Sequence, residues 1–382
     1  MTNLLTSTKR ILYVGGFELP DKNAAAQRVL GNAKALCALD YEVVFLDVSK
    51  EVKGTELSAP HDTEGFLTYS QCHATSIGGL LKYCCKPLHV EEVLQKHDNW
   101  HAVIAYNYPA LALWKLRKIC RKRSLKLYGD CTEWHTLGRF TPKFLLIQFD
   151  MFFRMRFVQK KLDGMIVISH YLENYYRKYT KTVVLPPLVD IHDAKWDRSA
   201  VKPHQGIRLV YFGSPGTHKD LVGEVVASLA EVPSGGSLQI VGITQEQFAS
   251  YYPCSANIAV QLVSQGKLKF LGRLPHREAL EVVKNSDYSI FYRKRDRTSM
   301  AGFPTKFTES ISCGVPVITT DTSDLGEYAQ GGKNAVLLPE ESFGEALVKF
   351  LETEAGKAIL VERRCFDYHN YLTLLENFIK VN

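Results

Sequence analysis

Short apolar runs alternate with helical patterns along almost the whole of this 382-residue chain. This alternation predicts parallel sheets whose strands are joined by crossover helices, that is, an α/β fold. The chain is longer than one hydrophobic core usually supports, so we expect two doubly wound domains. The predicted strands of the first half are 11–14, 42–47, 102–106, 125–129, 165–169 and 182–185. Those of the second half are 207–212, 237–241, 268–272, 288–292, 315–319 and 335–338.

A segment rich in proline and charge separates the two halves. The predicted organisation is a first domain over 1–190, a linker over 191–206, a second domain over 207–360 and a C-terminal helix within 361–382 that returns to the first domain. We expect the two sheets to face each other across a cleft. Ligands of such sheets bind beyond the carboxyl ends of the strands.

Composition excludes several classes. The formal charge of +7 is modest, and no run of about 18 apolar residues is present that would predict a membrane span. The first ten residues lack the order of a signal peptide, so we expect a cytoplasmic protein. Nine cysteines without paired spacing suit neither a disulfide framework nor a zinc site, and we expect them to be reduced.

Glycines follow the first strand of each half, at Gly15-Gly16 and in the loop from Gly213 to Asp220. Glycine lets the backbone approach a ligand closely. Neither loop has the glycine pattern of a dinucleotide fold or of a nucleotide triphosphate phosphate loop. The usual sequence motifs of enzymes that transfer hydride or hydrolyse nucleoside triphosphates are therefore not found in these loops.

The segment 301–318 is the most informative stretch. It reads as a glycine turn, a helix entered through Pro304 and a strand after Gly314. The positive end of a helix attracts phosphate. Lys306 and Glu309 would share one helix face, which suits the diphosphate and the ribose of a nucleotide. The alternative is a solvated ion pair worth about 0.2–0.5 kcal/mol.

Taken together, the order and spacing of these motifs resemble the retaining nucleotide-sugar glycosyltransferases with two Rossmann-like domains, the GT-B fold, in particular the family-4 type. The resemblance covers essentially the whole chain. Besides the two glycine loops, it rests on Asp130 to His135, Val167-Ile168-Ser169, Leu185-Pro186-Pro187, Phe270-Leu271-Gly272 and Gly302 to Ile318.

The resemblance implies a donor held mainly by the second domain and an acceptor held mainly by the first. Lys219 matches a lysine that contacts the donor diphosphate, and Glu309 matches the second glutamate of the E-x7-E pattern, which binds ribose. Two positions depart from the family pattern: Ala301 replaces the first glutamate, and Ser214 replaces a common arginine. Lys306 and the basic stretch 293–297 are the expected replacements.

The candidate catalytic residues are therefore His135, Lys219 and Lys306. The candidate donor-binding residues are Gly15, Gly16, Gly213, Ser214, Arg273, Arg293, Gly302, Phe303, Pro304, Thr305 and Glu309. His135 would hydrogen-bond the donor sugar or orient the acceptor; the alternative is a partly exposed loop histidine. Asp130 and Glu133 are not favoured as bases, and His170 is expected to begin a helix.

The expected chemistry needs no metal and no cofactor. Fixed cations and a helix N-terminus stabilise a departing diphosphate. The chain has no Asp-x-Asp motif and no H-E-x-x-H motif, which favours the metal-free version. Retention is then expected by front-face attack, in which the leaving phosphate oxygen accepts the proton of the acceptor.

Two basic segments concern location. The stretch 142–161 is rich in aromatic residues and cations with Asp150 as its one acid, and 115–123 is also cationic. A basic amphipathic surface of this kind predicts contact with an anionic bilayer. The alternative is that the apolar residues are core and the cations solvated. Nucleic acid is not expected as a partner, because no recognition motif accompanies the charge.

The predicted function is retaining, metal-independent transfer of a sugar from a nucleotide diphosphate to a glycan or lipid-linked acceptor, in bacterial surface polysaccharide or glycolipid synthesis. The predicted place is the cytoplasm, with peripheral attachment to the inner face of the membrane. One alternative is a sugar-nucleotide epimerase or glycan phosphorylase. Another is a catalytically degenerate, donor-binding partner subunit, for which Ala301 and Ser214 argue.

Overall fold

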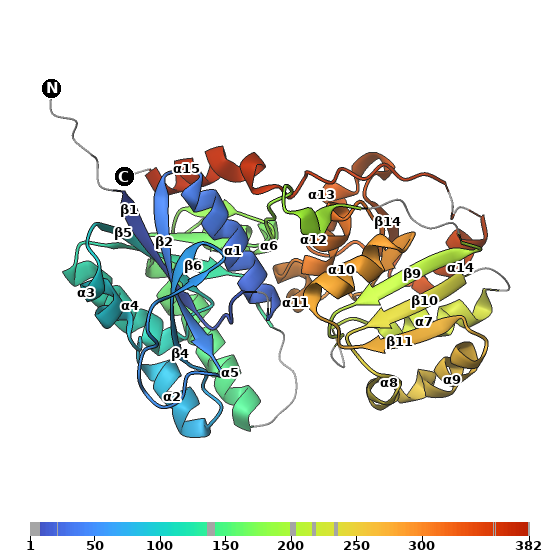
Figure 1. Ribbon diagram of the computed structural model, residues 1–382, viewed down its shortest axis with the longest axis horizontal. Coiled ribbons are helices and arrows are strands. Elements are labelled where there is room, and N and C mark those ends of the chain that lie inside the picture. Colours follow the sequence, from blue (N-terminus) through green and yellow to red (C-terminus); the bar gives the residue numbers. More distant parts are fainter. Residues whose placement is uncertain are drawn as a thin grey trace. The chain divides into compact units, whose positions relative to one another are not determined.

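The computed structural model describes residues 8–20, 22–135, 142–198, 204–215, 219–232, 236–353, 355 and 357–380. The chain divides into two compact units (Figure 1). The first comprises Met1–Asp190 and Asp367–Asn382, and the second comprises Ile191–Phe366. Each unit is a parallel sheet with helices packed on it. Within the described part of the chain, no helix is both long and apolar enough to cross a bilayer.

The first unit is built on an eight-stranded sheet. Its strands are β1 (Lys9–Gly15), β2 (Tyr41–Ser49), β3 (His61–Thr63), β4 (Phe66–Cys72), β5 (Trp100–Tyr106), β6 (Lys126–Cys131), β7 (Gly164–Val167) and β8 (Thr182–Val184). Their order is β3-β4-β2-β1-β5-β6-β7-β8. The short edge strand β3 pairs antiparallel with β4, and the pairings from β4 to β8 are parallel.

The helices of the first unit are α1 (Ala24–Cys37), α2 (Ile77–Cys85), α3 (Val90–Lys96), α4 (Ala110–Lys122), α5 (Pro142–Phe153), α6 (His170–Tyr176) and α15 (Leu372–Lys380). A π-helical turn, η1 (Arg154–Val158), continues α5 and is followed by η2 (Gln159–Lys161). The last helix, α15, packs on this unit: Leu375, Phe378 and Ile379 join the core formed by α1 and the sheet.

The second unit has a six-stranded parallel sheet in the order β11-β10-β9-β12-β13-β14. The strands are β9 (Ile207–Phe212), β10 (Gly236–Val241), β11 (Leu268–Gly272), β12 (Tyr288–Ile290), β13 (Val317–Thr320) and β14 (Ala335–Leu338). The helices are α7 (Val222–Glu231), α8 (Gln245–Tyr251), α9 (Ala256–Ser264), α10 (His276–Lys284), α11 (Arg297–Ala301), α12 (Thr305–Ser312), α13 (Leu325–Tyr328) and α14 (Phe343–Thr353).

The predicted fold class is confirmed, and each predicted strand overlaps an observed one. The sequence reading missed β3 and β4. It also extended β7 too far, because the Ser169 side chain caps α6 by accepting a hydrogen bond from the Leu172 N–H. The cap sets the boundary between β7 and α6, which the periodicity of apolar residues does not define.

The segment 191–206 was predicted as a linker, and its first part is packed on the second unit. Trp196 is buried, and the Arg198 guanidinium donates hydrogen bonds to the backbone carbonyls of Lys284, Ser286 and Gly314 at 2.7–2.9 Å. Residues 199–203 lie outside the described part of the chain.

Both sheets reverse their strand order at the first strand. The chain leaves β1 towards β2 on one side and later fills β5 on the other, and β9 stands in the same way between β10 and β12. Ligands of doubly wound sheets bind at such switch points, beyond the carboxyl ends of the strands. We therefore expect the functional site at the carboxyl ends of β1 and β5 in the first unit and of β9 and β12 in the second.

Candidate functional site

Three neighbouring strands of the second unit end in glycines with positive φ. Gly213 follows β9, Gly242 follows β10 and Gly272 closes β11, with φ of 102°, 116° and 62°. A Cβ atom on Gly242 would lie 2.3 Å from the carbonyl oxygen of Gly213. Only glycine fits such a place, and it leaves the backbone of this edge open to close approach. Gly213 and Gly272 were identified from the sequence, whereas Gly242 was not.

A buried ionic cluster lies directly at the switch point. Asp220 accepts hydrogen bonds from the Arg293 Nε at 2.5 Å, from the Tyr211 hydroxyl at 2.7 Å and from the Lys306 ammonium. The same ammonium donates to the Tyr211 hydroxyl at 2.9 Å. These four residues, called the Asp220 cluster below, come from β9, from the loop after it, from the segment that follows β12 and from α12. Their formal charges sum to +1, because one carboxylate faces two cations.

The electrostatics of the cluster are those of a carboxylate held ionised inside the protein. Burial would raise the pKa of Asp220, but the Arg293 guanidinium and the Lys306 ammonium together hold this pKa well below its usual range. Burial lowers the pKa of Lys306, against the attraction of Asp220. The cluster therefore keeps a fixed positive charge at the strand edge.

Helix α12 begins beside this charge. Pro304 occupies its N-cap position, not its first turn as predicted, and no side chain caps the helix. Lys306 Nζ lies 3.6 Å from the position of a Cβ on Gly213. Lys306 is 8% exposed and pairs with Asp220, so the solvated-pair alternative for this residue is wrong.

Glu309 lies one turn further along α12. Its Oε1 accepts a hydrogen bond from His276 Nε2 at 2.9 Å, and the carboxylate is 14% exposed. His276 begins α10, close after Gly272, and the sequence reading missed it. The charge of Glu309 also raises the pKa of Lys306, which agrees with the predicted shared face of these two residues.

The other candidates of the second unit differ in exposure. Ser214, Lys219 and Arg273 are exposed at the strand edge, while residues 216–218 of the predicted loop lie outside the described part of the chain. Of the basic stretch 293–297, Arg293 joins the cluster, whereas the exposed Arg295 pairs with Asp321 at 3.7 Å.

The side chain of Phe303 is buried. Its ring packs against Phe307, Tyr328 and Phe366. Ala301, at the position of the first glutamate of the family pattern, is fully buried. Phe303 was predicted to bind the donor together with Gly302, Pro304 and Thr305. Since its ring belongs to this aromatic core, any contact of Phe303 with a donor would come from its backbone.

The first unit has its own switch-point edge. Gly15 ends β1, where a Cβ would lie 2.8 Å from Cβ of Tyr106 on β5, and Gly16 lies near the Tyr83 hydroxyl. Asn107 follows β5 with a φ of 40° and donates through Nδ2 to the Thr132 hydroxyl at 2.7 Å. These contacts tie the ends of β5 and β6 together.

His135 extends this edge. Its Nε2 lies 3.1 Å from the Glu133 carboxylate, and both side chains are partly exposed. Arg154, buried in η1, donates from Nη1 to the Asn107 carbonyl at 2.6 Å, with Nη2 4.0 Å from Glu133. Arg154 was predicted as a surface cation, and the structure corrects this. Its burial places a guanidinium behind the Glu133–His135 pair.

Asp130 belongs to the interior of the first unit. It is fully buried and receives hydrogen bonds from Arg28 at 2.7–2.9 Å and from the Tyr13 hydroxyl at 2.6 Å. His170 begins α6 as predicted and pairs with Glu173 at 2.7 Å. These contacts do not bring either residue to the edge where His135 lies.

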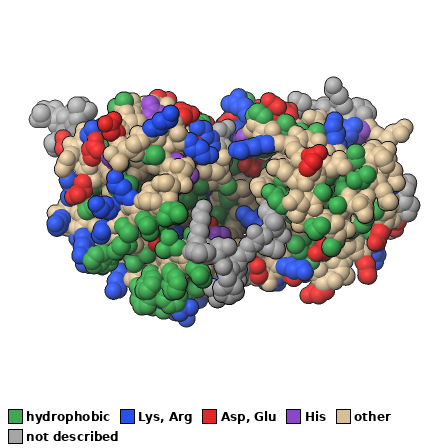
Figure 2. Space-filling view, turned by 90° about the horizontal axis from the view of Figure 1, so that it is seen from below, with side chains coloured by type: hydrophobic (Ala, Val, Ile, Leu, Met, Phe, Trp, Pro, Cys, Tyr) green, Lys and Arg blue, Asp and Glu red, His purple; other side chains and the backbone are tan. Residues whose placement is uncertain are grey.

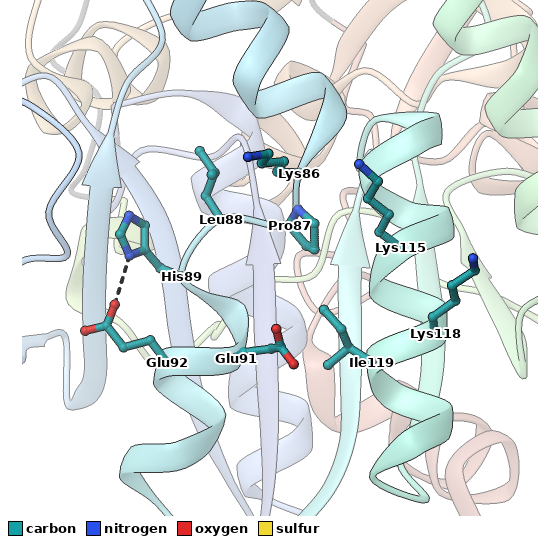
Figure 3. Close-up of a pocket in the computed structure, with 9 residues that line it drawn as sticks. All are labelled: Lys86, Pro87, Leu88, His89, Glu91, Glu92, Lys115, Lys118 and Ile119. Atoms are coloured by element: carbon teal, nitrogen blue, oxygen red, sulfur yellow. Dashed lines mark hydrogen bonds and ion pairs between the residues drawn. The ribbon is translucent and has the colours of Figure 1, made fainter.

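A groove of about 540 Å³ lies on the first unit between α4 and the segment joining α2 to α3 (Figure 3). Lys86, Lys115 and Lys118 line it together with the His89–Glu92 pair. None of the site residues named above lines this groove.

Comparisons with known proteins identify the family of a segment of the second unit and the fold of the chain. Residues 224–363 match the family of glycosyl transferases group 1. No curated protein sequence matches the chain significantly. Solved structures match its fold over nearly their whole length. The E. coli trehalose-6-phosphate protein bound with UDP-2-fluoro glucose has a TM-score of 0.70 at 11% identity, covering 98% of this chain and 100% of that one.

Anabaena HepE in complex with UDP and glucose has a TM-score of 0.67 at 14% identity, covering 97% of this chain and 99% of that one. The lipopolysaccharide outer core galactosyltransferase WaaB, in its apo form, has a TM-score of 0.61 at 13% identity, with coverage of 97% and 99%. The second unit thus carries a glycosyl transferases group 1 domain within a chain of GT-B fold, and the protein is a glycosyltransferase.

Proposed function

We propose that this glycosyltransferase moves a sugar from a nucleotide-diphosphate donor, with retention and without a metal or other cofactor, to a glycan or lipid-linked acceptor. The proposed setting is bacterial surface polysaccharide or glycolipid synthesis at the inner face of the cell membrane. The observation that carries the proposal is the Asp220 cluster beside Gly213 and the start of α12. It supplies fixed positive charge at the switch point of the domain that matches group 1.

In this proposal the second unit holds the donor. Lys306 and the exposed Lys219 contact the diphosphate. Glu309 accepts hydrogen bonds from the ribose hydroxyls, and His276 orients the Glu309 carboxylate. The glycine backbone at Gly213 admits the phosphates. The solved structures of similar fold that contain a UDP-sugar or UDP with glucose support a donor of this class.

Breaking the bond between the anomeric carbon and the diphosphate builds negative charge on the leaving oxygen. Preorganised cations stabilise this charge in a site that excludes water. The acceptor hydroxyl attacks on the same face, and its proton passes to the leaving phosphate oxygen. Bond cleavage, bond formation and proton transfer balance without an oxidant or a metal.

His135 and Glu133 would act on the acceptor side. Their pair at 3.1 Å would orient an acceptor hydroxyl, and Arg154 would hold Glu133 from behind. Arg154 is thus a positioning residue in this proposal, since it reaches the pair from inside the unit.

The experiment is a thermal-shift panel of nucleoside diphosphates and their sugar conjugates, followed by turnover assays with the stabilising donor after exhaustive chelation. A ligand at 100 times its Kd stabilises the folded state by about 2.7 kcal/mol. Selective stabilisation by one donor and full turnover after chelation are expected. Activity that is lost on chelation and restored by magnesium or manganese would overturn the metal-free reaction.

A second candidate is a donor-binding partner subunit without catalysis. The observation in its favour is the charge of the Asp220 cluster: Asp220 cancels one of two cations, and Ala301 and Ser214 depart from the family pattern. Such a subunit would bind the donor and give no transfer or donor hydrolysis as a purified protein.

A further inference from the structure

Large apolar side chains lie exposed together on one side of the first unit. Figure 2 shows a broad green patch over this unit in the view from below. We define the apolar face by Ile77 on α2, Trp114 on α4, and Phe149, Phe152, Phe153 and Phe157 on α5 and η1, which are 42–81% exposed. Helix α4 contacts α2, α5 and η1, so these elements are neighbours.

The local structure explains why the phenylalanines point outward. Met151, Arg154 and Met155 are the buried residues of this helix, so they fix its inner side. The π-helical turn at η1 then follows, and the three outer rings meet with centroids 5.5–6.0 Å apart. The alternative that these aromatic residues belong to the core is therefore wrong. A contiguous apolar patch on a protein surface marks an interaction site.

The cations around the apolar face lie over its aromatic rings. Lys118 Nζ is 3.6 Å from the centre of the Trp114 ring, and Arg156 is 4.8 Å from that of Phe152. Asp150, the one acid of the stretch 142–161, accepts a hydrogen bond from the Ala110 N–H at the start of α4. Helix α4 itself carries no acid. The rim is therefore cationic around an apolar centre.

We propose that the apolar face inserts into an anionic lipid bilayer, with the phenylalanines below the headgroups and the lysines and arginines at their level. Amphipathic surfaces with aromatic residues bind bilayers in this way. A second copy of the chain fits less well, because the two cationic rims would face each other. A lipid-linked acceptor would lie in such a bilayer, so this inference rests on the proposed function.

The groove of Figure 3 extends the same surface. Lys115 and Lys118 line it from α4, one and four residues after Trp114 of the apolar face, and Lys86 lines it from the end of α2. The groove also holds the carboxylates of Glu91 and Glu92, and Glu92 pairs with His89, so three ammonium groups face two carboxylates. The excess of ammonium groups provides contacts for headgroup phosphates beside the inserted rings. Each basic side chain near an anionic surface contributes about 1 kcal/mol of attraction.

The test uses the full-length protein and vesicles of equal parts phosphatidylcholine and phosphatidylglycerol. The variant Phe152→Ser/Phe153→Ser/Phe157→Ser should lose about 100-fold in vesicle partitioning, at about fivefold for each half-exposed ring. The matched control Val260→Ser/Leu360→Ser/Leu374→Ser removes three similarly exposed residues outside the apolar face and should bind as the wild type. Equal binding by all three proteins would overturn the proposal.

Insertion is separated from surface adsorption by Trp114 fluorescence with lipids brominated in the acyl chains. Quenching that disappears in Trp114→Phe is expected; binding without quenching would mean adsorption by charge alone and would overturn insertion. Sedimentation without vesicles tests the second copy: a dimer dissociated by the phenylalanine variant would also overturn the proposal.

The donor thermal shift in the absence of vesicles separates this inference from the proposed function. A protein that binds donor and ignores vesicles refutes the insertion alone. One that binds vesicles and no donor refutes the proposed function alone.

Discussion

Both units contain the same hydrogen-bonded arrangement near their first strand. A tyrosine of that strand, Tyr13 in β1 and Tyr211 in β9, donates its hydroxyl to a buried aspartate at 2.6 and 2.7 Å. An arginine donates its Nε to the same aspartate, at 2.9 Å from Arg28 to Asp130 and at 2.5 Å from Arg293 to Asp220.

The fourth member differs. In the first unit the Asn32 amide donates to the Tyr13 hydroxyl at 3.0 Å, and in the second the Lys306 ammonium donates to the Tyr211 hydroxyl at 2.9 Å. The first arrangement is neutral and serves packing, since Arg28 also holds the Leu185 carbonyl. The second carries one positive charge beside Gly213. The ammonium in place of the amide thus changes the formal charge of the arrangement from zero to +1.

The largest expected effect comes from breaking the neutral network. Arg28→Met leaves Asp130 buried without its cation, and removing one partner of a buried pair costs about 3–5 kcal/mol. The free energy of unfolding, measured in urea, should fall by that amount. Lys34→Gln on the same helix removes a half-buried pair with Asp190 and should cost under about 1 kcal/mol. Equal losses would show that Arg28 has no special structural role.

Lys306→Asn makes the second network resemble the first. We expect kcat to fall by about 10²–10³, because a preorganised group that stabilises the leaving charge is lost. Lys219→Ala should act in the same direction, and Arg295→Gln, which removes an exposed cation nearby, should be silent. A change in donor affinity with kcat unchanged would reduce Lys306 to a ground-state binding residue.

Glu309→Ala tests the ribose side of the second edge. Loss of charge-assisted hydrogen bonds should weaken donor binding by about 1.5–3 kcal/mol, measured by calorimetry. Glu278→Ala, an exposed position on α10, is the control. Wild-type affinity in Glu309→Ala would remove α12 from the nucleotide platform.

Asp47 offers a contrast to Asp130 and Asp220, because this buried carboxylate has no cation paired with it among the described residues. Burial raises its pKa from 3.8 to about 6. The folded state therefore holds a proton that the unfolded state has lost, so unfolding free energy should fall as pH rises from about 4 to 6, by on the order of 2 kcal/mol. In Asp47→Asn this fall should be absent. An unchanged pH profile in the variant would assign the dependence to other groups.

The sequence predicted the α/β class and the strands because their patterns are local. Apolar runs such as 207–212 and the glycine at 213 reflect the conformation of the chain at those positions. The order of the motifs then gave the resemblance to the GT-B fold. The edge strand β3 was not predicted, since it spans three residues, and its neighbour β4 was not predicted either.

The sequence by itself determined which charges and glycines stand at the strand ends. Only the tertiary structure decided how they are used. The two cations that pair with Asp220 lie 73 and 86 positions away in the chain, so no local pattern contains that cluster. The same holds for Arg154, which the sequence places among surface cations and folding buries behind Glu133 and His135. Burial and ion pairing depend on packing between distant segments, and they decide which cations remain available to a ligand.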